Sequence, residues 1–577
     1  TKVERLINGQ HPETGELIRR WGPNRTMVGG QDCTLSPAPK SVSILWALAD
    51  QPLRDELERM IIGAAAGAIA VMLGQEPLLR ERYGPGGNDR RFVTAQDYVG
   101  VQALHTTARL TEAKPGIPDP DLHVHSVVLG ALDTKGKLRA LESRQILNYG
   151  AQLDGHASAR LAELLRLRGF EIERELVRDA HGKVKRVAWE IKGVPRELVK
   201  AMSARSQEIE DLKRRYREAT GREAEGPGWE RFVTSHRGPK AKRTSSELRA
   251  AWEAEAREHG YGVEAVAAAK AQADARRIAG IPERREESPE AQELRREILA
   301  DLTREYARVP RRRLDALAQQ RAVGLVAPVI AEYTVAEMFG EGDLLLSTDG
   351  LYVTTLEVLA AEQRTTKATE RLLGSPPAPT ADLQRLEAEF REQEENGSPF
   401  DLAQREAITV ATSGAHFVSI AGPAGTGKGY ATRAMVNVWH NQGRRVIALA
   451  VAGRTAQQAQ ADSGADLGLT LDGLTARVDY DALQLRPSDV LLVDEAAMVD
   501  HWRYAPLLEA AADSGATLVQ VGDDKQLSPV EAGGLWTVTH AMAAERDLAV
   551  ELRTVRRARN PAEAEAWTDL RNGNVEK

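Results

Sequence analysis

The sequence predicts a multidomain α/β protein in which an α+β domain, a helical connector and a parallel sheet follow one another. The chain has 577 residues, which is too long for one hydrophobic core. Near its start, strand patterns mix with helical ones, and from Phe400 onward strands alternate with helices, as in a parallel sheet. We therefore expect domains at residues 1–220, 221–400 and 401–577.

In the first domain, the apolar spacing favours strands at residues 32–35 and 124–129. Helical spacing favours helices at residues 40–49, 52–73, 95–109 and 158–168. The most apolar run, at residues 61–73, continues an amphipathic pattern that starts at Pro52. We therefore expect a core helix there and no membrane segment in the chain.

Two histidines of the second strand can hold a metal ion. His123 and His125 flank Val124, and side chains at positions i and i+2 of a strand share one face. Neutral imidazole is the commonest protein metal ligand, and His105, in the helix expected at 95–109, could supply a third nitrogen. The alternative is that the pair is simply two polar residues on a solvated strand face.

Further segments set these histidines in a larger pattern. In chain order the pattern comprises Asp32, Thr34 and Ser36, residues 38–43 (APKSVS), His105, Thr107 and Arg109, and residues 122–125 (LHVH). This order resembles the relaxases of conjugative plasmids, of the MobF or TrwC/TraI-like kind. The resemblance implies an HUH endonuclease-like fold for residues 1–220. Pro37 and a long segment at 110–121 depart from the family pattern, although a longer loop costs little closure entropy.

The resemblance also implies a chemistry. In these relaxases a tyrosine hydroxyl attacks a DNA phosphate, and three histidines hold a metal that polarises the phosphate oxygens. It therefore implies a divalent metal, Mg or Mn with Zn as an alternative, on His105, His123 and His125. Asp32 would orient a histidine ligand or take the proton of the nucleophile. The alternative for Asp32 is a strand-end or turn aspartate.

The nucleophile itself is not identified. The family places a tyrosine cluster upstream of the Asp-x-Thr strand, but here Tyr83 and Tyr98 stand alone and downstream of Asp32. We expect the nucleophile to lie upstream of Thr1, in a segment that this sequence lacks. The alternative is that the chain cannot cleave DNA by the family mechanism.

The third domain contains a phosphate-binding loop, which lies between a strand expected at 416–420 and a helix expected from about residue 429. The loop residues are Gly422, Gly425, Thr426, Gly427 and Lys428. Glycines let backbone N–H groups surround phosphates, and the lysine reaches the β and γ oxygens. At Gly429, where serine or threonine usually ligates Mg²⁺, either another group completes the metal shell or ATP turnover is weakened.

Later motifs resemble superfamily 1 helicases, of the branch that includes conjugative relaxase-helicases, which implies a partial RecA-like domain. The strand at 490–493 ends in Asp494, which would hold Mg²⁺, and Glu495, which would position the attacking water. Residues 522–534 resemble the Gly-Asp-x-x-Gln-Leu motif, in which Gln526 would sense the γ-phosphate.

Three more positions carry roles that the same resemblance implies. Gln404 would read adenine, residues 453–456 (GRTA) would touch single-stranded DNA, and Arg557 would meet the γ-phosphate. The alternative for residues 552–559 is an exposed basic helix. The family's later motifs do not follow Arg557, and its tyrosine cluster does not precede Asp32. We therefore expect the chain to be truncated at both ends.

Composition and charge fit a soluble protein, with 42% hydrophobic residues, 28% charged residues and a net charge of −7. Nucleic acid could bind only at local basic clusters, and the simpler interpretation of each cluster is a solvated helix face. The clusters lie at residues 213–217, 240–243, 276–277 and 311–313. The single cysteine, Cys33, excludes an internal disulfide and fits a reducing bacterial cytoplasm.

We therefore expect a conjugative DNA relaxase fused to a helicase, which nicks a transfer origin by metal-assisted tyrosine transesterification and unwinds DNA with ATP. Expected partners are single-stranded and transfer-origin DNA, ATP with Mg, and accessory conjugation proteins. The alternative is a catalytically impaired relic that binds DNA and nucleotide without cutting, which the missing tyrosine cluster and Gly429 favour. A repair helicase with an unrelated first domain is disfavoured by Asp32, His105 and His123.

Overall fold

The computed structural model describes most of the chain between residues 30 and 554. The gaps are at 84–88, 140, 143–145, 180–181, 237, 240–242, 379, 481, 524, 526–528 and 530. Residues 4–5, 10, 14–16, 563, 566 and 569 are also described.

The chain divides into two compact units. The first contains residues 1–298 and 310–340, and the second contains residues 299–309 and 341–577. Most of the expected connector up to residue 340 thus folds with the first unit, and residues 341–400 fold with the second. The domain boundaries that we expect at residues 220 and 400 stay predictions.

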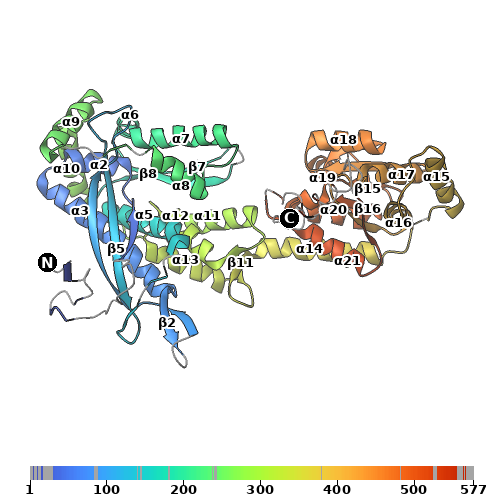
Figure 1. Cartoon of the computed structure of the whole chain (residues 1–577), viewed down its shortest axis with the longest axis horizontal. Coiled ribbons are helices and arrows are strands. Elements are labelled where there is room, and N and C mark those ends of the chain that lie inside the picture. The colour runs from blue at the N-terminus through green and yellow to red at the C-terminus, as the bar shows by residue number, and fades with distance from the viewer. Residues whose placement is uncertain are drawn as a thin grey trace. The chain divides into compact units, whose positions relative to one another are not determined.

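An antiparallel sheet forms the centre of the first unit, with the order β1-β5-β4 and with β6 paired to β5. The strands are β1 (Gln31–Leu35), β4 (Asp97–Thr107), β5 (Pro120–Leu132) and β6 (Leu138–Arg139). Along β5, Leu122, Val124 and Val128 are buried, whereas His123 and His125 alternate with them and are only half-buried. The long strand β5 packs against helices α2 (Lys40–Leu48) and α3 (Gln51–Gln75) (Figure 1). The histidines therefore lie on the face opposite the apolar one.

The helix predicted at residues 95–109 is wrong, because these residues form strand β4. Tyr98, Val99 and Val101 are aromatic or β-branched residues, which favour strands, and pairing along β5 satisfies the backbone of the segment. A bulge follows Val99, and at Gly100 a Cβ would lie 2.9 Å from the carbonyl oxygen of Val127. The correction places His105 on a strand, directly opposite His123.

The other elements predicted around this sheet are confirmed. The strands at 32–35 and 124–129 lie within β1 and β5, and the helices at 40–49, 52–73 and 158–168 correspond to α2, α3 and α5 (Gly150–Leu167). Asp50 caps α3 by accepting a hydrogen bond from the backbone N–H of Leu53 at 3.0 Å. By length and composition α3 could cross a membrane, but Leu57, Ile61 and Ile69 are fully buried within the unit, so packing accounts for its apolar character.

Two hairpins and a set of helices complete the first unit. The hairpins pair β2 (Leu79–Tyr83) with β3 (Asp89–Val93) and β7 (Ile172–Arg178) with β8 (Val184–Ile191). The helices are α6 (Arg196–Ala201), α7 (Ala204–Thr220), α8 (Gly226–Ser235), α9 (Ser245–Glu258), α10 (Val263–Ala279), α12 (Arg311–Ala322) and α13 (Pro328–Gly340). Helix α11 (Pro289–Glu305) contains the boundary at residue 298.

In the second unit, the described strands include a six-stranded parallel sheet with the order β14-β13-β15-β16-β12-β17. The strands are β12 (Phe417–Ala421), β13 (Val446–Ala450), β14 (Leu467–Thr470), β15 (Val490–Val493), β16 (Thr517–Gly522) and β17 (Ala549–Glu551). The parallel sheet predicted from the alternating pattern is confirmed. A smaller sheet of β9 (Val309–Pro310), β10 (Leu344–Leu346) and β11 (Tyr352–Thr355) precedes it.

Helices cover both faces of the parallel sheet, so its strands are apolar on both sides. One apolar layer packs against α16 (Leu402–Ala411), α17 (Lys428–Asn441) and α18 (Gly453–Ser463). The other packs against α14 (Leu356–Gly374), α19 (Leu471–Asp479), α20 (His501–Ser514) and α21 (Leu535–Ala544). Helix α15 (Leu383–Glu395) adds Leu386 and Phe390 to the first layer. Because the strands are parallel, their carboxyl ends meet at one edge, where the phosphate-binding loop leaves β12.

Candidate metal centre and nucleotide site

Three imidazoles converge on the solvent-facing side of the β1-β5-β4 sheet. The centroid of the His105 ring lies 5.3 Å from that of His123 and 4.3 Å from that of His125. The centroids of His123 and His125 are 5.5 Å apart. One nitrogen atom of each ring lies within 4.8 Å of the other two, a separation that one metal ion can bridge. Within the described residues, no other group of three His, Cys, Asp or Glu side chains comes together in this way.

Strand β1 orients the ring of His125. The Oδ2 atom of Asp32 lies 2.8 Å from the Nδ1 atom of His125, and the Oγ1 atom of Thr34 lies 3.1 Å from the same nitrogen. A ring that donates its Nδ1–H to a carboxylate keeps a lone pair on Nε2 for a metal. The Asp-x-Thr pair therefore contacts a histidine of the cluster, as the orienting role predicted for Asp32 requires.

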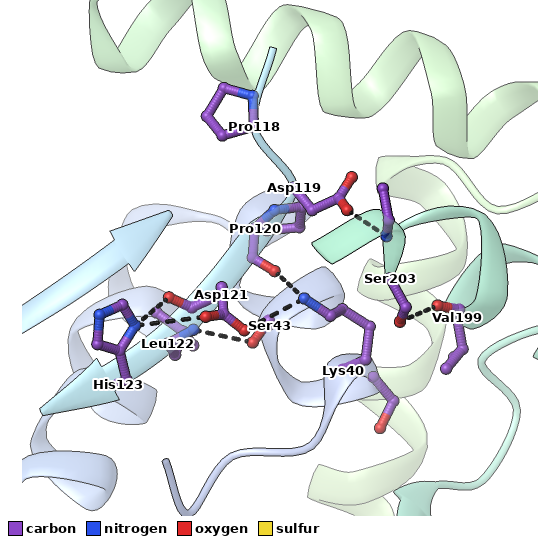
Figure 2. Close-up of polar contacts among 12 residues, drawn as sticks. Lys40, Ser43, Pro118, Asp119, Pro120, Asp121, Leu122, His123, Val199 and Ser203 are labelled. Atoms are coloured by element: carbon purple, nitrogen blue, oxygen red, sulfur yellow. Dashed lines mark hydrogen bonds and ion pairs between the residues drawn. The ribbon is translucent and has the colours of Figure 1, made fainter. Parts of the chain in front are cut away.

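The ring of His123 is held in a similar way from within its own strand. Its Nδ1 atom lies 3.1 Å from the backbone carbonyl oxygen of Asp121 and 3.4 Å from the Oδ2 atom of the same residue (Figure 2). Two of the three rings thus have their Nδ1 atoms engaged by oxygen atoms. The nitrogen donors present fit a divalent transition metal, for which imidazole is a suitable ligand.

The tyrosines described near this sheet do not reach the histidines. The hydroxyl of Tyr98 donates to the carbonyl oxygen of Ala66 on α3, at 3.4 Å, which is on the helix side of the sheet. The hydroxyl of Tyr149 donates to Glu76 at 2.7 Å. The side chain of Tyr83 lies outside the described residues. The position of the nucleophile stays a prediction.

In the second unit, the phosphate-binding loop has the backbone that its glycines predict. Gly425 and Gly427 have φ angles of +85° and +81°, a region that other residues rarely adopt. Helix α17 begins at Lys428, so its N-terminus faces the loop. The Nζ atom of Lys428 donates to the carbonyl oxygens of Gly422 at 2.6 Å and Pro423 at 3.2 Å. The lysine side chain therefore lies over the loop.

The acidic pair lies at the same edge of the sheet. Strand β15 ends at Val493, and the N–H of Asp494 donates to the carbonyl oxygen of Leu449 at 2.9 Å. Burial raises the pKa of Asp494, and burial together with the neighbouring Asp494 raises the pKa of Glu495. Glu495 has a φ angle of +52°, and such non-glycine strain is typical of functional sites. The positive charge of Lys428 has a smaller, opposite effect and favours the ionised form of both carboxyl groups, which lowers their pKa values.

Gln404 lies next to the loop but is fully buried. Its side-chain oxygen accepts from the N–H of Asp401 at 3.1 Å, and its side-chain nitrogen donates to the carbonyl oxygen of Thr426 at 3.2 Å. The side chain thus links the start of α16 to the phosphate-binding loop. Its predicted role in reading adenine stays a prediction.

Gly429 has open space where a side chain would start, because a Cβ there meets no atom within 4 Å. Packing therefore does not explain the missing hydroxyl. Gln526 and Arg557 lie outside the described residues, so their predicted roles stay predictions.

The basic cluster at residues 213–217 lies on α7, where its charges are paired locally. Lys213 pairs with Glu210 at 2.7 Å, and Arg214 pairs with Asp211 at 2.9 Å. These pairs support the interpretation of this cluster as a solvated helix face.

Sequence reasoning missed two polar residues near the histidines. Asp121 contacts His123, and Lys40 contacts Asp121 (Figure 2). Asp121 could have been found, since it lies two positions before His123 on the same face of β5. Lys40 lies in the segment 38–43 that the resemblance marks, but its contact with Asp121 was not foreseeable, because that contact depends on how α2 packs against β5.

Two segments of the chain match known protein families. Residues 1–259 match the family model of the TrwC relaxase, and residues 400–577 match that of an AAA domain. The probable conjugal transfer protein TraA of Sinorhizobium fredii is 33% identical over 174 residues, which are 30% of this chain and 15% of TraA. The ATP-dependent RecD2 DNA helicase of Deinococcus radiodurans is 31% identical over 237 residues, covering 37% of this chain and 31% of the helicase.

Among solved structures, a metal-bound conjugative relaxase TrwC in complex with OriT DNA is 24% identical, with a TM-score of 0.34. That match covers 45% of this chain and 83% of the TrwC chain. The histidine-bearing antiparallel sheet lies in the segment that matches the TrwC relaxase, and the parallel sheet with the phosphate-binding loop lies in the segment that matches the AAA domain. The chain thus contains a segment that matches the TrwC relaxase and a segment that matches an AAA domain. It spans 15% of the length of TraA, so the activity, substrates and partners of the whole protein are matters for proposal.

Proposed function

We propose that this protein acts on DNA during conjugative transfer, nicking a transfer origin at its first unit and unwinding DNA with ATP at its second. The convergence of His105, His123 and His125 on one point carries this proposal. Support comes from the TrwC relaxase family match, and from relatives described as conjugal transfer proteins and DNA helicases. Single-stranded and transfer-origin DNA are the proposed substrates, in the bacterial cytoplasm, with accessory conjugation proteins as further partners.

In the first unit, His105, His123 and His125 would hold a divalent metal through ring nitrogens. The all-nitrogen donor set suits Zn²⁺ better than Mg²⁺ or Mn²⁺, which both prefer oxygen ligands. When bound, the metal would polarise the non-bridging phosphate oxygens and stabilise the charge that develops on them. Asp32 fixes the ring of His125, and 47% of its side chain is exposed, so a substrate proton could also reach it.

The proposed reaction is a transesterification. A tyrosine oxygen forms a bond to the phosphorus, and the bond from phosphorus to the 3′ oxygen breaks. The tyrosine hydroxyl gives up its proton, and the 3′ oxygen gains one, so the strand with the 5′ phosphate stays attached to the protein. We propose that Asp32 would accept the tyrosine proton.

In the second unit, we propose that the phosphate-binding loop and Lys428 hold the phosphates of ATP. Asp494 would hold Mg²⁺, and Glu495 would orient the attacking water. Gln526 and Arg557 are proposed to respond to the γ-phosphate, on the sequence resemblance alone.

A cleavage assay tests the proposal. Its substrate is a single-stranded transfer-origin oligonucleotide, and its enzyme is a gene product that carries an upstream tyrosine cluster. We expect cleavage to require a divalent metal and to fall more than about 100-fold in His123→Ala, since losing even an outer-shell partner costs about 10–100-fold. ATP hydrolysis in the same variant is the control and should not change. Unchanged nicking in His123→Ala would remove the metal-site assignment.

The alternative function, a protein that recognises DNA without cutting it, gives a different result in the same assay. It predicts that the oligonucleotide binds and stays intact at every metal concentration. Gly429 and the lack of a tyrosine near the histidines among the described residues are the observations that favour it.

A further inference from the structure

Strand β1 is shorter than the strand that it pairs with. It ends at Leu35, opposite Val124, so the part of β5 before Val124 has no neighbour on that edge. Residues at positions i and i+2 of a strand direct their backbone groups to the same edge. The carbonyl oxygen of Pro120 and the N–H of Leu122 therefore need partners other than β1.

The first turn of α2 supplies both partners. The Nζ atom of Lys40 donates to the carbonyl oxygen of Pro120 at 2.7 Å, and the N–H of Leu122 donates to the Oγ atom of Ser43 at 3.1 Å (Figure 2). Ser43 is fully buried, and the Lys40 side chain is only 12% exposed. Helix α2 thus continues the edge contacts of β5 where β1 stops.

The same lysine also holds the carboxylate beside the metal centre. Its Nζ atom lies 3.3 Å from the Oδ1 atom of Asp121, whose other oxygen, Oδ2, lies 3.4 Å from the Nδ1 atom of His123. One carboxylate therefore bridges an ammonium group and an imidazole, as Figure 2 shows. Without the ammonium, the Asp121 side chain, which is 44% exposed, could turn toward solvent.

We propose that Lys40 is a positioning residue for the metal centre, which acts on His123 through Asp121. It fixes the backbone of β5 before the ligand and holds the carboxylate that orients the His123 ring. This role rests on the proposed metal site. Asp121 contacts the ring of His123 directly, and the ammonium of Lys40 holds the Asp121 carboxylate in the position for that contact.

Electrostatics and positioning make opposite predictions for Lys40→Met. Removing a positive charge near a divalent cation strengthens metal binding if charge alone matters. If Lys40 positions His123, its loss weakens metal binding instead, because the ring is no longer held in the binding orientation. The sign of the change in metal affinity therefore separates the two roles.

The experiment measures the dissociation constant of Mn²⁺ for the full chain without nucleotide, by calorimetry. We expect Asp121→Asn to weaken Mn²⁺ binding about tenfold, at the lower end of the range of about 10–100-fold for outer-shell partners. Lys40→Met should weaken it about threefold, because Lys40 acts one step further from the metal. The double variant should bind about as weakly as Asp121→Asn, because residues that act through one another are not additive. Lys40→Arg should restore binding, since a guanidinium can reach the same oxygen atoms.

Lys114→Met is the matched control. Lys114 is also a lysine bonded to an aspartate just before the ligands, at 2.7 Å from Asp119, but it does not contact Asp121 or His123. This variant should melt at a lower temperature, because Asp119 is buried, yet bind Mn²⁺ as the wild type does.

Two outcomes would overturn the proposal in distinguishable ways. Wild-type binding that survives His123→Ala would overturn both the metal site and the role of Lys40. Binding that is lost in His123→Ala, but is unchanged or tighter in Lys40→Met, would overturn only the role of Lys40. Additive losses in the double variant would also show that Lys40 does not act through Asp121.

Discussion

The first unit assembles its candidate site from side chains on three antiparallel strands, whereas the second assembles its site from loop backbone at the edge of a parallel sheet. In the first, Asp32, His105 and His123 are far apart in sequence and meet only through strand register. In the second, most of the phosphate-binding groups fall within residues 422–428. The histidine site therefore depends on correct long-range strand pairing, whereas the phosphate-binding loop depends mainly on local backbone geometry.

The largest effect expected from this comparison is the loss of ATP hydrolysis in Lys428→Ala. Removing one group that stabilises transition-state charge costs about 100- to 1,000-fold in rate. Metal affinity at the histidines should not change, because the two sites share no residue. A phosphate-release assay and Mn²⁺ calorimetry on the same sample measure both. The exposed Lys367 on α14 gives a matched control, Lys367→Ala, and joint loss of both functions in Lys428→Ala would contradict two separate sites.

A second prediction concerns the stability of the first unit at low pH. His156 is 5% exposed, and its Nδ1 atom has no hydrogen-bond partner among the described residues. Burial, with a smaller contribution from Arg160, lowers the pKa of His156 to about 4. The unfolded chain takes up the proton at its ordinary pKa of about 6.5, so the stabilisation by neutral His156 is complete above that pH and is lost as the pH falls toward 4.

The matched variant is His156→Gln, which cannot take up this proton. We expect the free energy of unfolding of the wild type, relative to this variant, to fall by about 3 kcal/mol between pH 7 and pH 4. Asp315, Glu332, Glu76 and Arg311 line the same cavity, and taking the difference between the two proteins cancels their titration. Denaturant unfolding at several pH values measures this difference in the free energy of unfolding. A difference that does not change with pH would show that His156 is not held neutral.

The smallest expected effect is a gain of function in the second unit. Gly429→Ser places a hydroxyl where the loop usually ligates Mg²⁺, and a Cβ at this position meets no other atom within 4 Å. We expect ATP hydrolysis to rise about tenfold, which corresponds to a barrier lowered by about 1.4 kcal/mol. Gly429→Ala is the control, because it adds the Cβ without the hydroxyl. Equal rates in the two variants would show that another group already completes the metal shell.

Much of the fold was predictable from the sequence, and the errors have physical causes. The parallel sheet was predictable because each of its strands is buried on both faces and reads as a short apolar run, such as residues 490–493. Strand β4 was not, because Val101, Leu104 and Ala108 also fit a helical spacing, and only pairing with β5 decides between the two.

The candidate sites also contain some features that were predictable from the sequence and some that were not. His123 and His125 were predictable as a pair because the period of a strand is two, and the phosphate-binding loop was predictable because its motif is continuous. The register that places His105 opposite His123 was not predictable from the spacing, since the pairing depends on a segment at 108–119 whose length the sequence does not restrict. Lys40 lies in the motif segment 38–43, but its contacts with Pro120 and Asp121 depend on helix packing and were not predictable from the chain.

The pairing of His105 with His123 has a consequence for how such proteins can change over evolutionary time. Adding or deleting one residue within β4 or β5 would turn every later side chain to the opposite face, and one imidazole would leave the cluster. The connection between these strands is under no such constraint. Insertions and deletions should therefore accumulate in the connection and be rare within the two strands, so that homologues vary in length at this place while their histidines keep the same spacing to the strand ends.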